Sequence, residues 1–245
     1  MVNGAPWPVH EVEAVRHRLR LLNASNARHY RLEAVTDDGR RLGLVQIGAD
    51  QGLLAAPVTH TSLPVAPSER YDVIIDFGAC RPAAGCACGT GSAADAPARS
   101  WRSGSPARRP TTAPSPGALR GPAHLAALAG DGGPGVHLPR RPYRAGARLV
   151  HRGQPFDPAR TDVRTRLGAV EVWRLRADAH HPVHLHQTGF RVLSRDGGPP
   201  LPYDAGLKDT VSLRPGRRRR SSPASTVTGA ASSSTATMPS TRTWG

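Results

Sequence analysis

The stretch HPVHLHQTGFRVL, residues 181–193, places His181, His184 and His186 ahead of an apolar run. Successive side chains of a β-strand point to opposite faces, so His184 and His186 are expected on one face and His181 on the other. Imidazole is a good ligand for copper, zinc and iron. One short strand can therefore supply ligands to two different metal centres.

A solvated histidine cluster is the alternative interpretation of this stretch, because an isolated His-x-His pair is common. His180 directly precedes the motif and is interpreted as a neighbouring strand residue rather than a ligand. Pro182, Leu185 and Phe190 stand in register with the histidines. This combination favours a metal-binding strand over a solvated loop.

Short strands broken by Gly and Pro predict an antiparallel sandwich or barrel in the N-terminal part of the chain. The expected strands lie at 18–23, 29–35, 44–50 and 70–77, with a turn at Asp38-Gly39. A further strand is expected over 167–175, before the histidine motif. The sequence thus indicates an all-β protein.

The pattern HPxHLHxxxF resembles the third-domain copper motif of multicopper oxidases, in particular the bacterial laccase, spore-coat laccase and phenoxazinone synthase group. The strings QPFDP and LGAVEVWRL before it are also similar to that domain. The strings VNGAPWP, RLRLLNASNARHYRL, IGADQGLL and SERYDVIIDF, within 1–78, resemble the second cupredoxin-like domain. The resemblance covers roughly 1–78 and 153–216.

This resemblance implies two incomplete cupredoxin-like Greek-key β-sandwich units with a disordered middle segment and tail. The expected division is 1–78 (second cupredoxin-like domain), 79–150 (low-complexity), 151–216 (third domain with the copper motif) and 217–245 (basic Ser/Thr-rich tail). The third domain is expected to lack its terminal strand. By the same resemblance we assign structural roles to Asn23, Ser25, Arg28, Glu69, Arg70 and Asp72.

The strong basic charge of the chain raises a second hypothesis. Lys and Arg number 33 against 18 Asp and Glu, which gives a net charge of +15. Such charge is typical of proteins that bind nucleic acid or another polyanion. The arginines, however, gather in Pro/Ser/Ala-rich segments such as 99–120 and Arg217–Arg220. A basic, partly disordered nucleic-acid-binding or polyanion-binding protein is therefore the alternative function, and it is disfavoured.

Reading frame offers another account of the basic segments. Ser234–Trp244 can be spelled with permitted codons that, read one base earlier, encode FHCHNAEHEDM, which resembles the last copper motif of the family. The family's His-Cys-His triplet would then fall where Thr235, Ala236 and Thr237 stand. We therefore interpret 79–150 and 217–245 as out-of-frame sequence and the chain as a fragment.

The resemblance also implies a copper site and a reaction. His181 corresponds to a ligand of a type 1 copper, His184 to a type 2 ligand and His186 to a type 3 ligand. The family oxidises phenolic or similar small molecules by one electron at a time and reduces dioxygen to water. With its ligand set incomplete, this chain alone is expected to be inactive. Asp209 is either an outer partner of a ligand histidine or a structural turn residue.

Other assignments are weaker. A cupin or a small cupredoxin electron carrier does not account for residues 1–78. Cys80, Cys86 and Cys88 lack metal-ligand spacing and are odd in number, so no role is assigned to them. No apolar run is long enough to span a membrane and no signal region is visible, so no membrane partner is expected. The compartment is not readable.

Overall fold

The strands of the computed structural model form two compact units, which are described one at a time. The first comprises 1–49 and 53–120, and the second comprises 50–52 and 121–245. The structure describes residues 1–6, 8–80, 85–90, 101–103, 135–138, 150–151, 154–155, 159, 163–164, 170–177, 180–186, 188–214, 225–232 and 237–238. The expected site residues His181, His184 and His186 fall within these ranges, whereas Arg217–Arg220, Thr235 and Ala236 lie outside them.

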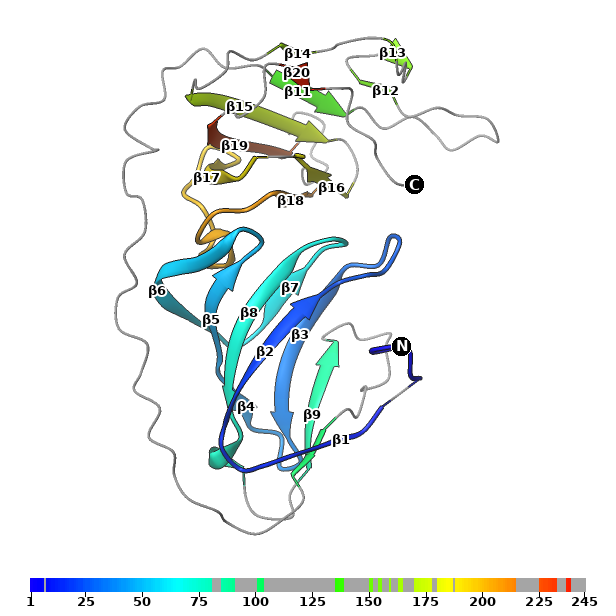
Figure 1. Ribbon diagram of the computed structural model, residues 1–245, viewed down its shortest axis with the longest axis vertical. Coiled ribbons are helices and arrows are strands. Elements are labelled where there is room, and N and C mark those ends of the chain that lie inside the picture. Colours follow the sequence, from blue (N-terminus) through cyan, green and yellow to red (C-terminus); the bar gives the residue numbers. More distant parts are fainter. Residues whose placement is uncertain are drawn as a thin grey trace. The chain divides into compact units, whose positions relative to one another are not determined.

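A four-stranded antiparallel sheet carries much of the core of the first unit (Figure 1). Its order is β2 (Arg16–Leu22), β8 (Arg70–Asp76), β5 (Leu44–Ala49) and β6 (Gly52–His60). Along β8, every second side chain (Tyr71, Val73, Ile75) is buried, as the pleat of a half-buried strand requires. The strands predicted near 18–23, 44–50 and 70–77 are confirmed.

The other sheet of this unit has six strands, with β3 as its most connected member. The order is β1 (His10–Val12), β10 (Trp101–Ser103), β9 (Gly85–Thr90), β3 (Tyr30–Thr36) and β4 (Arg41–Leu42), and β7 (Leu63–Val65) also pairs with β3. The turn from β3 to β4 uses Gly39 at a φ of +81°. Both the strand predicted at 29–35 and the turn at Asp38-Gly39 are confirmed.

The polar residues assigned structural roles hold turns and strands of the first unit together. Asn23 Nδ2 donates to the carbonyls of Arg28 (2.7 Å) and Val65 (2.9 Å). Glu69 Oε2 accepts from the amide nitrogen of Ala66 at 2.7 Å. Ser25, Arg70 and Asp72 bond Tyr30, the Ser68 carbonyl and Arg18, respectively. These bonds agree with structural roles.

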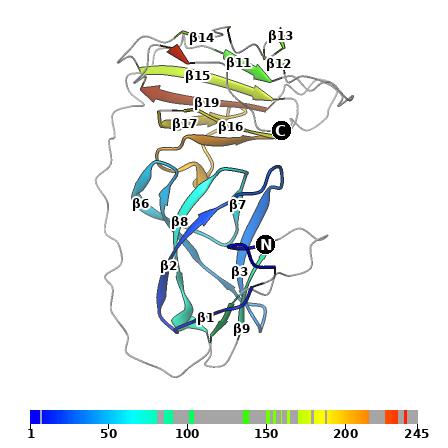
Figure 2. The ribbon, with the colours of Figure 1, turned by 45° about the vertical axis from the view of Figure 1, so that its right-hand side comes forward.

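The second unit contains the histidine motif (Figure 2). Its four-stranded sheet has the order β11 (Gly135–Leu138), β15 (Val170–Ala177), β19 (Ser225–Ser232) and β17 (Phe190–Arg195). Three antiparallel pairs complete it: β16 (His181–His184) with β18 (Thr210–Leu213), β12 (Val150–His151) with β13 (Gln154–Pro155), and β14 (Val163–Arg164) with β20 (Thr237–Met238).

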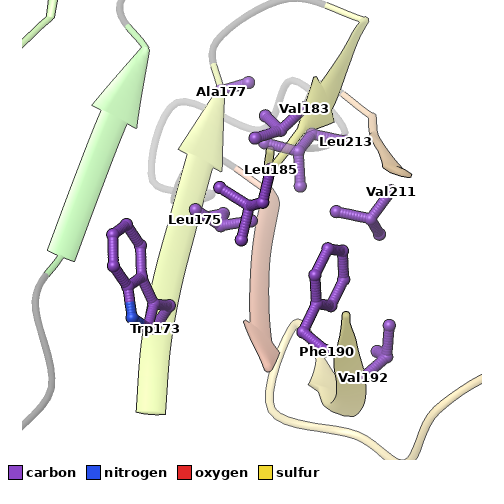
Figure 3. Packing of buried hydrophobic residues seen from close by; sticks show 9 residues of the cluster. All are labelled: Trp173, Leu175, Ala177, Val183, Leu185, Phe190, Val192, Val211 and Leu213. Atoms are coloured by element: carbon purple, nitrogen blue, oxygen red, sulfur yellow. The ribbon is translucent and has the colours of Figure 1, made fainter. Parts of the chain in front are cut away.

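The core of the second unit is built from β15, β16, β17 and β18. Figure 3 shows Trp173 and Leu175 from β15, with Val183, Leu185 and Phe190 among the side chains packed beside them. The whole cluster is Trp173, Leu175, Ala177, Val183, Leu185, Phe190, Val192, Val211 and Leu213. Because Val183 and Leu185 belong to this cluster, the strand that carries the histidines is fixed against the core.

The expectations for the middle segment and the tail need correction. Within 79–150 and 217–245, the described residues form β9, β10, β11, β19 and β20, so those residues lie in strands rather than in a disordered segment. The sequence predicts a third domain without its terminal strand, whereas β19, which follows residue 216, pairs with both β15 and β17 in this sheet. Ladder bonds join backbone groups, so a strand of small Ser, Thr and Ala residues can fill this place without apolar alternation.

The part of the chain that the structure describes also contains two short 3₁₀ helices, η1 (Phe77–Ala79) and η2 (Pro202–Asp204). Cys80, which follows η1, is disulfide-bonded, so the expectation that the cysteines have no role is wrong for this residue. Asp204 of η2 accepts two hydrogen bonds of 2.6 Å from Arg195, and both side chains are almost fully buried. Among the described residues, no helix is long and apolar enough to cross a membrane.

Candidate metal centre

Strand β16 sets the directions of the three histidines of the motif. It pairs with β18 so that His181 lies opposite Leu213 and His184 lies opposite Thr210. Val183 and Leu185 are buried. His184, which lies between them, and His186, which follows them, are exposed. His181 lies two residues before Val183, so its side chain is on the same face of the strand as the buried Val183. The alternation expected from the sequence is therefore confirmed, with His186 placed just beyond the end of the strand.

His181 is half-buried and has an unsatisfied ring nitrogen. Its Nδ1 is buried and makes no hydrogen bond to any of the residues that the structure describes. Burial lowers the pKa of His181, and the backbone of Pro182 offsets part of this effect. A neutral imidazole with a buried, unbonded nitrogen costs stability in an apolar site unless something binds it.

His184 is held by two polar residues of the neighbouring segment. Its Nδ1 lies 2.9 Å from Thr210 Oγ1 and 3.3 Å from Asp209 Oδ1. The Thr210 hydroxyl donates its proton to Asp209 Oδ1 at 2.9 Å. The hydroxyl must therefore accept from His184, which assigns the proton to Nδ1 and the lone pair to Nε2.

The ring of His186 lies beside that of His184. Their centroids are 4.9 Å apart and the rings are tilted by 60°. Both residues are exposed. The motif therefore presents two adjacent imidazoles on one side and one half-buried imidazole on the other.

Further polar groups, which the sequence did not single out, surround this site within the second unit. Gln51 Nε2 donates to Asp209 Oδ2 at 2.7 Å, and Asp50 Oδ2 accepts from the backbone nitrogens of Asp209 and Thr210 at 3.2 Å each. Lys208 Nζ lies 3.3 Å from Asp50 Oδ2. The turn sequence ADQG and the string KDT carry these groups, but no local pattern connects residues that far apart along the chain.

His180 lies outside this arrangement. Its Nε2 lies 3.1 Å from Ser212 Oγ, on the strand that faces β16. This contact agrees with its interpretation as a neighbouring strand residue.

The donors present fit copper as a partial set. Imidazole nitrogens suit this metal, and the outer hydrogen bond of His184 is the arrangement usual for a metal-bound histidine. Within the described ranges, however, no three His, Cys, Asp or Glu side chains are grouped closely enough to hold a metal ion. The described residues therefore supply only part of a copper ligand set.

Comparison with known proteins identifies the family that this arrangement of histidines is typical of. A family model described as multicopper oxidase matches residues 135–222, which include all three histidines. The chain is also 32% identical over 253 residues to a laccase of Bacillus stratosphericus, a match that covers 88% of this chain and 47% of the laccase. The chain belongs to the multicopper oxidase family.

The chain is also similar to a protein named for another role and to a solved multicopper oxidase structure. The chain is 34% identical over 222 residues to the cell division protein FtsP of Escherichia coli, covering 86% of this chain and 45% of that protein. The multicopper oxidase McoA of Aquifex aeolicus, in its 2F4 variant, has a similar structure, with a TM-score of 0.76 at 26% identity over 96% of this chain and 52% of the other.

These matches confirm the predicted family and the all-β, cupredoxin-like fold, with copper as the cofactor that the family implies. They also show that the chain spans about half the length of the curated relatives it matches. The individual ligand roles of His181, His184 and His186 and the boundaries of the expected domains stay predictions.

Proposed function

We propose that this chain carries copper donors of a laccase-type oxidase, with His181 as a ligand of an electron-accepting type 1 copper and His184 and His186 as ligands of the type 2 and type 3 coppers. The observation that carries this proposal is the buried, unbonded Nδ1 of His181 on the strand face opposite the His184–His186 pair.

Copper, when bound, supplies one-electron acceptance from a phenolic substrate and the reduction of dioxygen to water. The chain's own residues hold and orient the donors. Thr210 and Asp209 keep the proton of His184 on Nδ1, so that Nε2 is its metal-binding atom. The hydrophobic cluster around Val183 and Leu185 fixes the strand, which limits how far the rings can move.

The chain by itself does not turn over substrate. The described residues form no three-donor group, and the positions of the family's His-Cys-His triplet hold Thr235, Ala236 and Thr237. A type 1 copper needs a cysteine thiolate beside its histidines. The reaction therefore needs ligands beyond those that the described residues supply.

We propose further that the segments 79–150 and 217–245 hold out-of-frame translations of family sequence. The family model matches residues 135–222, so within these segments the proposal applies to 79–134 and 223–245. Sequencing of the coding DNA tests this directly. A single-base correction that restores FHCHNAEHEDM supports it, and DNA that stands as read contradicts it.

Copper titration of the purified full chain tests the ligand assignment. Isothermal titration calorimetry with Cu²⁺ compares the wild type with His184→Ala and His186→Ala, and with His180→Ala as the matched control from the same stretch. Each ligand variant should bind at least about 10-fold more weakly, while the control binds like the wild type. Equal affinities in all four proteins contradict the proposal.

A phenol-oxidation assay on the same samples tests the second part of the proposal. The wild-type chain with copper should show no intense blue colour and no oxidation above that of free copper. An intense blue band with turnover would show that the ligand set is complete.

A non-catalytic binding role is the second candidate. The likeness to FtsP, which is named for cell division, and the lack of a three-donor group among the described residues favour it. The same calorimetric titration separates the copper-binding role from the non-catalytic role. A non-catalytic protein should bind Cu²⁺ no more tightly than its His184→Ala and His186→Ala variants do.

A further inference from the structure

A buried network links the turn after β5 to the histidine motif within the second unit. Asp50 and Gln51 belong to this unit although they come early in the chain. Their partners are Lys208, Asp209 and Thr210, which lie about 160 residues later. Contacts between such distant residues reflect the folded arrangement alone.

The Asp209 carboxylate is bonded at both of its oxygens. Gln51 Nε2 donates to Oδ2 at 2.7 Å, and Thr210 Oγ1 donates to Oδ1 at 2.9 Å. Only 6% of the Asp209 side chain is exposed. With both oxygens engaged, the carboxylate has one orientation, and that orientation determines where the Thr210 hydroxyl points its proton.

The backbone of Asp209 and Thr210 is held by the carboxylate of Asp50. Asp50 Oδ2 accepts from the nitrogens of Asp209 and Thr210 at 3.2 Å each. Lys208 Nζ lies 3.3 Å from this oxygen, and both charged side chains are fully buried. The opposite charges of Lys208 and Asp50 are therefore buried side by side, and the same carboxylate oxygen also accepts the two backbone bonds.

We propose that Gln51 and Asp50 are positioning residues for His184. Gln51 acts through the Asp209 carboxylate and Asp50 through the backbone of Asp209 and Thr210. Together they keep the Thr210 hydroxyl as an acceptor for His184 Nδ1–H, which reserves Nε2 of His184 for the metal. This inference rests on the proposed function only in naming the metal; the control of the histidine proton stands on the hydrogen bonds themselves.

The expected effect is a loss of metal affinity without loss of any ligand. Partners outside the ligand shell fix the tautomer and the ring orientation, and their removal lowers metal affinity by about 10- to 100-fold. A merely structural network would change the stability of the fold but would leave the proton on His184 Nδ1.

The test uses the full chain labelled with ¹⁵N-histidine and two isosteric variants, Gln51→Leu and Thr210→Val. Long-range ¹H–¹⁵N spectra of the metal-free protein report which ring nitrogen of His184 carries the proton, and calorimetry reports Cu²⁺ affinity. Asp50→Asn is not used, because it would leave the Lys208 charge buried without its partner.

Two matched variants serve as controls. Thr210→Ser keeps the hydroxyl and should restore the wild-type spectrum and affinity. Ser212→Ala removes a hydroxyl two residues along the same strand, one that contacts His180 instead, and should change neither.

The expected result is a fixed Nδ1–H tautomer in the wild type, a mixture of tautomers in both isosteric variants, and a 10- to 100-fold loss of Cu²⁺ affinity. Unchanged tautomer and affinity in both variants overturn the inference. A tautomer change without any histidine-dependent Cu²⁺ binding in the wild type supports the positioning role and contradicts the proposed function. The two claims therefore fail separately.

Discussion

His60 in the first unit and His181 in the second are histidines with similar burial effects and different contacts. Burial lowers the pKa of both. His60 Nε2 lies 2.9 Å from Gln46 Oε1, and the other end of the Gln46 amide donates to the carbonyl of Gly48. His181 Nδ1 is buried and has no hydrogen-bond partner among the described residues.

The difference separates a structural histidine from a candidate ligand. The amide orientation of Gln46 means that His60 donates from Nε2, so the pair is satisfied. The nitrogen of His181 is instead left in a site where burial without a hydrogen bond is unfavourable. Buried polar atoms of this kind are rare in folded proteins and point to a bound group or a functional role.

The largest effect is expected from His60→Leu. This change leaves Gln46 Oε1 buried without its donor, so the free energy of unfolding should fall by about 1–3 kcal/mol. Urea denaturation measures it. The double variant His60→Leu/Gln46→Leu should recover part of the loss, because replacing both partners removes the unsatisfied group. A single variant as stable as the wild type would show that the pair is not structural.

His181→Leu should act in the opposite direction. The change removes a buried nitrogen that has no partner, so the free energy of unfolding of the metal-free chain should stay the same or rise by up to about 1 kcal/mol. The same urea experiment measures it. A loss of stability as large as that of His60→Leu would erase the distinction between the two histidines.

The smallest effect is the dependence of stability on pH through His60. Its folded pKa lies below the ordinary value of 6.5, so between these two values the unfolded chain binds more protons. Stability should therefore be constant well above pH 6.5 and fall as the pH drops through 6.5 toward the folded pKa. The experiment compares His181→Leu with His181→Leu/His60→Leu, so that only His60 differs. Parallel curves of the free energy of unfolding against pH for these two variants would contradict this account.

The sequence predicts the strands of this chain well where apolar side chains alternate. The strand around Val73 and the faces of His181, His184 and His186 follow from a period of two, because each strand has one side against a core. His60 could not be identified as a buried, paired histidine, since its partner Gln46 lies on another strand.

Two features were beyond sequence reasoning for different reasons. Strand β19 consists of small residues, and its place between β15 and β17 depends on backbone bonds that carry no side-chain signal. The bond from Gln51 to Asp209 joins residues 158 positions apart, and only the fold brings them together. The motif alone thus gives the candidate ligands, but the groups that orient them require the structure.

Pulsed electron paramagnetic resonance of the full chain loaded with one equivalent of Cu²⁺ tests the central claim most directly. The nuclear modulation reports how many imidazoles bind the metal, and selective ¹⁵N labelling of histidine identifies the bound nitrogens. The account predicts imidazole coupling that is reduced by His184→Ala and by His186→Ala and unchanged by His60→Leu, without a thiolate-type blue copper signal. Coupling that survives both alanine variants, or a blue copper signal in the wild-type chain, would contradict it.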